Sequence, residues 1–349
     1  MRLPKPNAKF WIGLVGSFLG FLPLHGAEFW NPMFNANLTA GYRQDNFSWN
    51  MSGLHDTPDQ LWTMYWKGLQ IYETTTQLSY TSCNNYSIRG YGAYGVIQGG
   101  SVTARGLAQD IYSTSFTSSS TSSSPSRSHH NNFSRIHGDC SDGSVWDGKG
   151  AVGYQWMSNG RRFVITPVLG YSFSSLNLKM NHARQTVNTI DFPVLLGKIP
   201  GLHVDYKPRI QGPFVGFDMI TMVEVPCVLL FGTFEFHWDQ YRSNGKWNLQ
   251  NQFIHSWRDR TTGHGLYVNL GFNYRMGCNW YLGVVGSYRN WHGREGRHVS
   301  KSLTNTLAEP DQIFGTMPAI PPREHTNCKR IQWNSWSVAA TLDFRFWDY

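Results

Sequence analysis

The sequence contains few charged residues, and it has no long apolar run after its first 24 residues. Charged residues make up 15% of the 349 residues, and the mean hydropathy is −0.39. A membrane-spanning helix needs about 20 consecutive apolar residues. Any membrane crossing by the mature chain must therefore use β-strands. The formal net charge of +8 is not accompanied by a nucleic-acid-binding motif, which favours anionic lipid headgroups as partners and excludes nucleic acid.

Residues at metal-ligand spacing are also missing. His129 and His130 are adjacent, but no Cys, Asp or Glu stands at ligand distance from them. They follow a tract over residues 113–128 that consists almost entirely of Ser and Thr. Such a tract buries too little apolar surface to order itself, so we expect a solvated surface segment. The sequence predicts no metal site and no cofactor.

The N-terminus has the pattern of a secretory signal peptide. Three basic residues precede or border an apolar run over residues 10–24, and the small residues Gly26 and Ala27 follow. The run is shorter than a spanning helix requires, which favours a cleaved signal over a retained anchor. We therefore expect a signal peptide at 1–27 and a single barrel domain at 28–349.

The remaining chain contains segments in which apolar and polar residues alternate. The clearest is 265–275, where one face is apolar and the other carries Asn, Gly and Arg. This period of two fits a strand with one face toward lipid and the other toward a polar lumen. In the next segment, Trp280 and Tyr288 are eight residues apart. With a strand tilt near 40°, they lie about 20 Å apart along the membrane normal, close to the spacing of two aromatic girdles.

Ten such segments alternate with four short turns and five long loops. The segments cover approximately 36–49, 69–82, 86–104, 149–158, 162–174, 209–221, 227–240, 265–275, 280–289 and 338–346. The long loops are expected at about 50–68, 105–148, 175–208, 241–262 and 293–330. Short turns at one end and long loops at the other are typical of outer-membrane barrels. The predicted fold class is all-β: a transmembrane up-and-down antiparallel β-barrel of about ten strands in the cell outer membrane. A soluble β-sandwich is the alternative.

Five cysteines follow the signal peptide. Cys83, Cys227 and Cys278 are expected at the short periplasmic turns, and Cys140 and Cys328 in external loops. An odd number leaves at least one thiol free or bonded to another molecule. Two alternatives remain open for these cysteines. They make a disulfide or non-covalent contact with another envelope protein, or they are free cysteines that serve only as small side chains.

One group of residues in the segment 227–240 could carry chemistry. Glu235, His237 and Asp239 share a face because they are two residues apart in a strand, and we expect them in the lumen near the external mouth. A carboxylate fixes the tautomer of a neighbouring His and raises its basicity, as a general base requires. A purely structural ladder of lumen charges is the alternative.

The layout of ten strands with five long loops resembles the omptin barrel, a superfamily of outer-membrane proteases and adhesins. The local resemblance runs from Tyr206-Lys207-Pro208-Arg209 through Pro213-Phe214-Val215-Gly216 and Phe231-Gly232-Thr233-Phe234 to Trp291. The whole pattern, with Cys in the turns and Trp-rich strands, is similar to the Protochlamydia outer membrane protein family. This resemblance implies an omptin-like barrel of chlamydial type with a proposed porin role.

Omptins use an Asp-x-Asp pair after the third strand and an Asp-x-His pair in the fourth loop. The first pair would fall near residues 108–110, where only Asp110 is acidic. Glu235 and His237 have the spacing of the second pair but lie earlier in the chain, and Asp239 follows them. The omptin pattern is therefore incomplete. An aspartic-type endopeptidase with Asp110, Glu235, His237 and Asp239 as its site is retained as the alternative function.

Omptins also bind lipopolysaccharide through basic residues at the outer rim. Basic residues that we expect in loops at that level are Arg242, Lys246, Arg258, Arg260, Arg294 and Arg297. Guanidinium groups match phosphate geometry well, and solvated loop charge is the alternative. The sequence thus predicts a porin-like or surface-interaction protein. Its expected partners are outer-membrane lipid, lipopolysaccharide, other envelope proteins and a host surface.

Overall fold

The computed structural model describes residues 33–51, 62–108, 131–158, 163–188, 196–222, 227–248, 256–277, 279–301 and 325–347. Its strands are β1 (Met33–Met51), β2 (Trp62–Thr81), β3 (Tyr86–Ala108), β4 (Asn131–Asp139), β5 (Gly143–Tyr154), β6 (Trp156–Met157), β7 (Phe163–Asn188), β8 (Gly197–Lys198), β9 (Val204–Met222), β10 (Val228–Trp247), β11 (Ser256–Arg275), β12 (Trp280–Gly293), β13 (Gly296–Lys301) and β14 (His325–Trp347). Within these ranges, no helix is long and apolar enough to cross a membrane.

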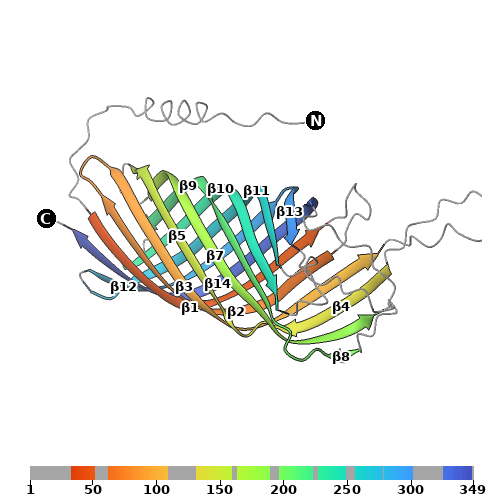
Figure 1. Ribbon diagram of the computed structural model, residues 1–349. Helices are drawn as coiled ribbons and strands as arrows, with labels where there is room; N and C mark the ends of the chain where they lie inside the picture. Colours follow the sequence, from red (N-terminus) through yellow and green to blue (C-terminus); the bar gives the residue numbers. More distant parts are fainter. Residues whose placement is uncertain are drawn as a thin grey trace, which may run out of the picture.

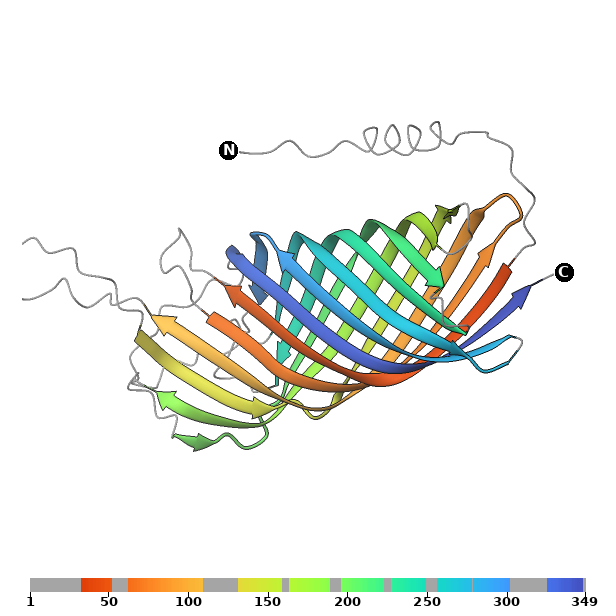
Figure 2. The same cartoon turned by 180° about the vertical axis from the view of Figure 1, so that it is seen from behind.

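The strands form one antiparallel sheet that closes into a barrel, because β1 pairs with both β2 and β14. β4, β5 and β6 follow one another along the chain and together occupy one position of the ring. β8 and β9 share a position in the same way, and so do β12 and β13. The ring therefore has ten positions, and the predicted up-and-down barrel of about ten strands is confirmed. The red β1 and the blue β14 lie side by side in both views (Figures 1 and 2).

The two ends of the barrel differ in their connections. The start of β1 and the end of β14 lie at the same end as the tight turn from β2 to β3. In that turn Asn85 has a φ of 65°, which Asn tolerates better than most residues. We call this the turn end, and the opposite end the loop end. The predicted turns at 158–161 and 221–226 fall mostly outside the described residues.

The outer surface of the barrel changes from apolar to polar along each strand. On β1, Phe34, Leu38 and Tyr42 point outward in the half near the turn end, and Phe34 and Leu38 are exposed. Further along the same face, Gln44 and Asn46 take their place. A band of exposed apolar side chains is stable only against lipid. The half of the barrel near the turn end is therefore the part that a membrane surrounds.

Aromatic side chains mark both edges of this apolar band. At the edge of the band that lies near the middle of the barrel, Tyr94 packs on Trp146 with ring centroids 4.5 Å apart. Near the turn end, Tyr86 packs on Tyr154 at 5.5 Å. Two such aromatic belts are characteristic of the two membrane–water interfaces. The predicted pair of girdles is present, with Trp280 exposed in the belt at the turn end.

The inner surface changes in the opposite direction, from polar near the turn end to apolar near the loop end. Beyond the apolar band, the lumen is filled by a continuous cluster of buried side chains, which we call the aromatic core. Tyr206 stacks on Trp66 and on Trp257, and Tyr241 stacks on Trp291. Its further aromatic members are Phe47, Trp49, Trp247 and Trp333. The loop-end half of the barrel therefore resembles a water-soluble barrel, with polar residues outside and an apolar interior.

This inversion explains why the predicted loops are too long. The segments 241–247, 256–262 and 325–330 were expected in loops but belong to β10, β11 and β14. Likewise β4 and the start of β5 lie within the expected loop 105–148, and β7 continues into the expected loop 175–208. Beyond the membrane the alternation persists with its apolar residues facing inward. A strand prediction that requires apolar residues on the lipid-facing side therefore ends each strand too early.

The cysteine predictions were wrong at Cys328 and agree with the structure at the other three described positions. Cys83 lies at the β2–β3 turn, and Cys227 is exposed just before β10. Cys140 lies in the short connection between β4 and β5, whereas Cys328 lies in β14 and not in a loop. Both are fully buried members of the aromatic core. These four thiols are all unpaired, and Cys278 lies outside the described residues.

Candidate functional site in the barrel lumen

β10 carries the three predicted residues on its inner face. Glu235, His237 and Asp239 are 0%, 8% and 5% exposed. These residues lie on the turn-end side of the aromatic core and not at the external mouth. The inner face of β10 continues beyond them toward the loop end, from Tyr241 to Trp247. The fourth predicted catalytic residue, Asp110, lies outside the described residues.

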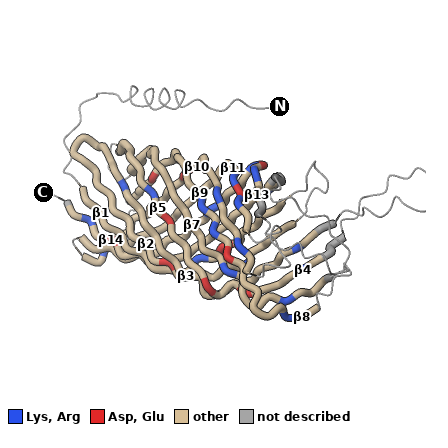
Figure 3. The backbone as a smooth tube through the Cα atoms, in the orientation of Figure 1, with Lys and Arg blue, Asp and Glu red and all other residues tan. Residues whose placement is uncertain are grey.

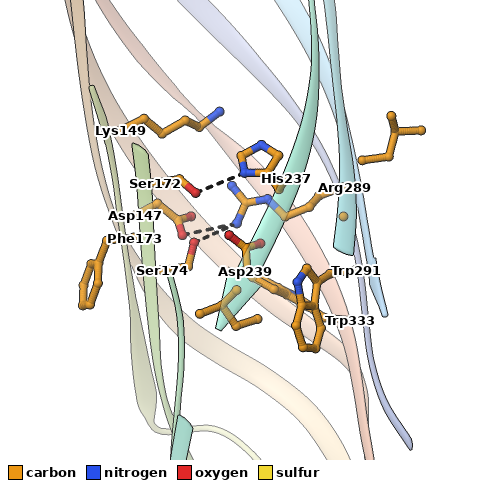
Figure 4. A pocket seen from close by; sticks show the side chains of 13 residues that line it. Asp147, Lys149, Ser172, Phe173, Ser174, His237, Asp239, Arg289, Trp291 and Trp333 are labelled. Carbon is orange, nitrogen blue, oxygen red and sulfur yellow. Dashed lines mark hydrogen bonds and ion pairs between the residues drawn. The ribbon is translucent and has the colours of Figure 1, made fainter. Parts of the chain in front are cut away.

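His237 links a carboxylate to a hydroxyl. Its Nε2 is 3.0 Å from Glu235 Oε2, and its Nδ1 is 3.0 Å from Ser172 Oγ. A carboxylate accepts hydrogen bonds, so Nε2 carries the proton and Nδ1 accepts from the serine hydroxyl. The imidazole also stacks on Phe214, with ring centroids 4.9 Å apart. The contacts lock the ring in one orientation and one tautomer, as Figure 4 shows for Ser172 and His237.

Glu235 is held by cations as well as by His237. Arg89 donates to Glu235 Oε1 at 2.7 Å, and Lys149 lies 2.9 Å from Glu235 Oε2. Arg89 also pairs with Asp218 at 2.8 Å. A buried carboxylate is costly unless it is paired and fully hydrogen-bonded. These partners satisfy Glu235, so it is built into the barrel as a charged junction of β3, β5 and β10.

A second set of charges lies across the lumen. Arg43 contacts Asp45 at 2.7 Å, Glu73 at 2.6 Å and Asp147 at 2.7 Å. Arg289 contacts the other oxygen of Asp147 at 3.3 Å. Both guanidinium groups face the ring of Trp333, with centroid distances of 5.4 and 4.7 Å. Together with the Glu235 group, these residues form what we call the charged layer.

The space between the two sets is small. A cavity of about 20 Å³ is lined by residues that include Asp147, Ser172, His237, Asp239 and Arg289 (Figure 4). That is room for about one water molecule. The group combines an oriented imidazole, a hydroxyl and two cations, which are the elements of proton-transfer chemistry. A peptide chain does not fit into this space.

Ser172 and Lys149 were not among the predicted site residues. Both occupy inward positions of their strands, and this alternation was visible in the sequence. Their approach to β10 depends on the closed ring, which brings β5, β7 and β10 together around one lumen. Gly212 also contributes, because a Cβ there would lie 2.8 Å from the Cα of Asp239. The glycine lets β9 pack closely against the site.

The predicted headgroup-binding residues lie on the outer surface of the loop-end half. Arg242 and Lys246 are on β10, Arg258 and Arg260 on β11, and Arg297 on β13; each is exposed. The expectation that these five occupy loops was wrong, because the strands extend beyond the membrane. Arg294 is exposed in the connection between β12 and β13.

The sheet register aligns three of these arginines with a fourth, Arg209, in one row. Arg209 of β9 pairs with Arg242, Arg242 with Arg260, and Arg260 with Arg297. We call these four residues the arginine row, and Figure 3 shows the blue positions gathered on β9, β10, β11 and β13. Like charges directly opposite each other destabilise a sheet. An anion that bridges the guanidinium groups would remove this cost.

The chain matches known proteins in sequence pattern and in fold. The model of the Protochlamydia outer membrane protein family matches residues 37–346. The fold is similar to the outer membrane protease OmpT from Escherichia coli, with a TM-score of 0.67 and 13% identity over 90% of this chain and 97% of that chain. A further match is the translocator domain of the autotransporter NalP from Neisseria meningitidis, with a TM-score of 0.36, 8% identity and coverage of 97% and 96%.

No protein of curated function matches the sequence significantly. The family match covers most of the chain, and the apolar band, the aromatic belts and the closed ring agree with it. The protein therefore belongs to the Protochlamydia outer membrane protein family and is an outer-membrane β-barrel with an omptin-like fold.

Proposed function

We propose that this protein is a surface-interaction barrel whose outer extension binds phosphorylated lipid headgroups, including those of lipopolysaccharide. The observation that carries the proposal is the arginine row. Its members are exposed, and Arg242 is four residues beyond Trp238, an exposed aromatic residue of the outer belt. Four residues of tilted strand span about 10 Å along the normal, which is the level of headgroup phosphates.

The neighbouring positions strengthen the positive charge. Lys207 of β9 and Arg258 of β11 flank Asn244 in the next outward row, and Lys246 pairs with Asp205 beyond it. Asp205 is thus an acidic residue at the edge of a mainly basic face. Arginine forks bind phosphate oxygens in pairs, and each charge-assisted hydrogen bond contributes about 1.5–3 kcal/mol.

The test replaces two central members of the row. Arg242→Gln with Arg260→Gln should weaken binding of lipopolysaccharide to the refolded protein in neutral detergent by about tenfold or more. The matched control is Arg184→Gln with Lys198→Gln, because these residues are also exposed and paired across β7 and β8. Equal losses in both double variants, or no loss in the first, would contradict the proposal.

A porin-like role is less well supported by the geometry. The aromatic core fills the loop-end half of the lumen, and the charged layer closes the centre with ion pairs shorter than 3.4 Å. Barrels of about eight strands are filled by side chains, while aqueous pores need about sixteen. We expect no discrete current steps from the refolded protein in planar bilayers. Regular steps would favour a channel instead.

The endopeptidase alternative is supported by one contact, the hydrogen bond between His237 and Glu235. Its weakness is access, because the adjoining cavity holds about one water molecule. Cleavage of a fluorogenic peptide by the parent protein, lost in His237→Ala, would establish it. Absence of cleavage by the parent would remove it.

A further inference from the structure

The lumen near the turn end contains a second, much larger cavity. Its volume is about 430 Å³, and its lining runs from Ser82 and Asn85 at the turn to Arg89 and Asp218 in the charged layer. Pockets that hold small-molecule ligands are usually about 300–1,000 Å³. This space is therefore of ligand size, and its position is separate from the arginine row and from the small cavity beside His237.

One wall of this turn-end cavity consists of uncharged hydrogen-bonding side chains. β1 and β2 contribute a ladder of amides and hydroxyls, and β12 and β14 contribute further hydroxyls. Representative members are Asn35, Thr39, Gln77, Ser79 and Ser287. Groups of this kind both donate and accept hydrogen bonds. They suit a ligand that is itself rich in neutral donors and acceptors.

The charged residues around the cavity are held in ion pairs. Arg89 pairs with Asp218, and Arg345 lies 2.9 Å from Asp343. Glu73 is paired with Arg43 at 2.6 Å. A free anion or cation would have to compete with these short ion pairs. The electrostatics therefore favour a ligand without net charge.

Part of the wall is apolar. Phe231, Ile220, Val285 and Ala339 line the cavity together with the polar side chains. A Cβ at Gly271 would lie 2.4 Å from Phe231 Cζ, so the glycine allows the phenyl ring to rest against β11. A ligand that offers C–H groups on one face and hydroxyls at its edges matches such a mixed lining.

The cavity is closed on the side of the loop end. The charged layer and the aromatic core lie between it and the loop end, and residues of the β2–β3 turn lie at its other limit. In an outer-membrane barrel the short turns face the periplasm. We propose that the turn-end cavity is a binding site for a small neutral saccharide that enters and leaves from the periplasmic side.

Maltose is a suitable probe because it is neutral and rich in hydroxyl groups. It is titrated into the refolded mature chain in detergent micelles, and binding is followed by saturation-transfer NMR and calorimetry. We expect saturable binding. Gln77→Leu should weaken it by about fivefold, the equivalent of one lost hydrogen bond. Ser79→Phe should abolish binding because the ring occupies the cavity.

Thr76→Leu is the matched control, since Thr76 is exposed on the lipid side of β2 beside Gln77. It should leave maltose affinity unchanged. Failure of the parent protein to bind maltose saturably into the tens of millimolar would overturn the proposal, and this readout needs no variant to fold. Equal binding of glucose 6-phosphate would overturn the preference for a neutral ligand. Maltose passage through proteoliposomes would overturn the one-sided opening.

Discussion

Arg43 and Asp147 form a 2.7 Å ion pair across the lumen, joining β1 to β5, which are not neighbours in the ring. The same guanidinium also contacts Asp45 and Glu73, and Arg43 is 3% exposed. One buried cation thus forms ion pairs with carboxylates from three different strands. The pair links two strands that are separated by β2 and β3 in the ring, at the level where the membrane ends.

Removing this cation should destabilise the barrel strongly. Arg43→Met leaves Asp45, Glu73 and Asp147 facing one another in a buried space, and breaking a buried ion pair costs about 3–5 kcal/mol. Unfolding by urea in detergent micelles measures the loss. The control Arg258→Met removes an exposed arginine and should change stability by less than about 0.5 kcal/mol. A neutral effect of Arg43→Met would contradict the role assigned to it.

The change of surface polarity along β1 can be tested on a single face of one strand. Leu38 and Asn46 both point outward, but Leu38 lies in the apolar band and is 49% exposed. Leu38→Arg should cost about 2–4 kcal/mol, because it places a charge against lipid. Asn46→Arg should be nearly neutral, because that position lies beyond the membrane. Equal costs in lipid-vesicle unfolding experiments would place the boundary elsewhere.

The aromatic core should contribute stability independently of the membrane. Trp66 is 1% exposed and stacks on Tyr206 at 5.0 Å. Trp66→Ala removes a fully buried indole and should cost about 3–5 kcal/mol in urea unfolding. Trp146, in the outer aromatic belt, is 56% exposed, so Trp146→Ala should cost clearly less. The reverse order would show that the loop-end interior is not the packed core described above.

Thiol labelling should distinguish the buried cysteines from the exposed one. Burial raises the pKa of Cys140 to about 11, so at pH 7 only about one thiol in ten thousand is ionised. Each unit increase in pH should therefore raise its labelling rate about tenfold until the pH approaches the pKa, with burial keeping the absolute rate low. Maleimide should label the exposed Cys227 first. Rapid labelling of Cys140 at pH 7 in the folded protein would contradict its burial.

The alternation of residues in the sequence determined the barrel class and most of the strand positions. Lipid imposes a simple rule, since a sheet must close on itself and expose apolar residues on one face. The segment 265–275 and the terminal residues 338–346 satisfy that rule with local information alone. The inward position of Glu235, His237 and Asp239 also follows from strand periodicity.

The length of the strands beyond the membrane was decided by tertiary structure. There the alternation continues with reversed polarity, and only the packed interior shows that Trp257 or Trp333 points inward. The contacts between strands that are distant in the sequence could not be predicted from the sequence either. Ser172 reaches His237, and Arg209, Arg242, Arg260 and Arg297 form one row, only because the ring sets the register of each pair.

The sequence by itself therefore determined which face each residue of a membrane strand occupies, because that depends on a period of two and on the solvent. Only the tertiary structure decided which residues meet across the lumen and along the outer surface. Those meetings depend on ring closure and register, which arise from the packing of all ten positions together.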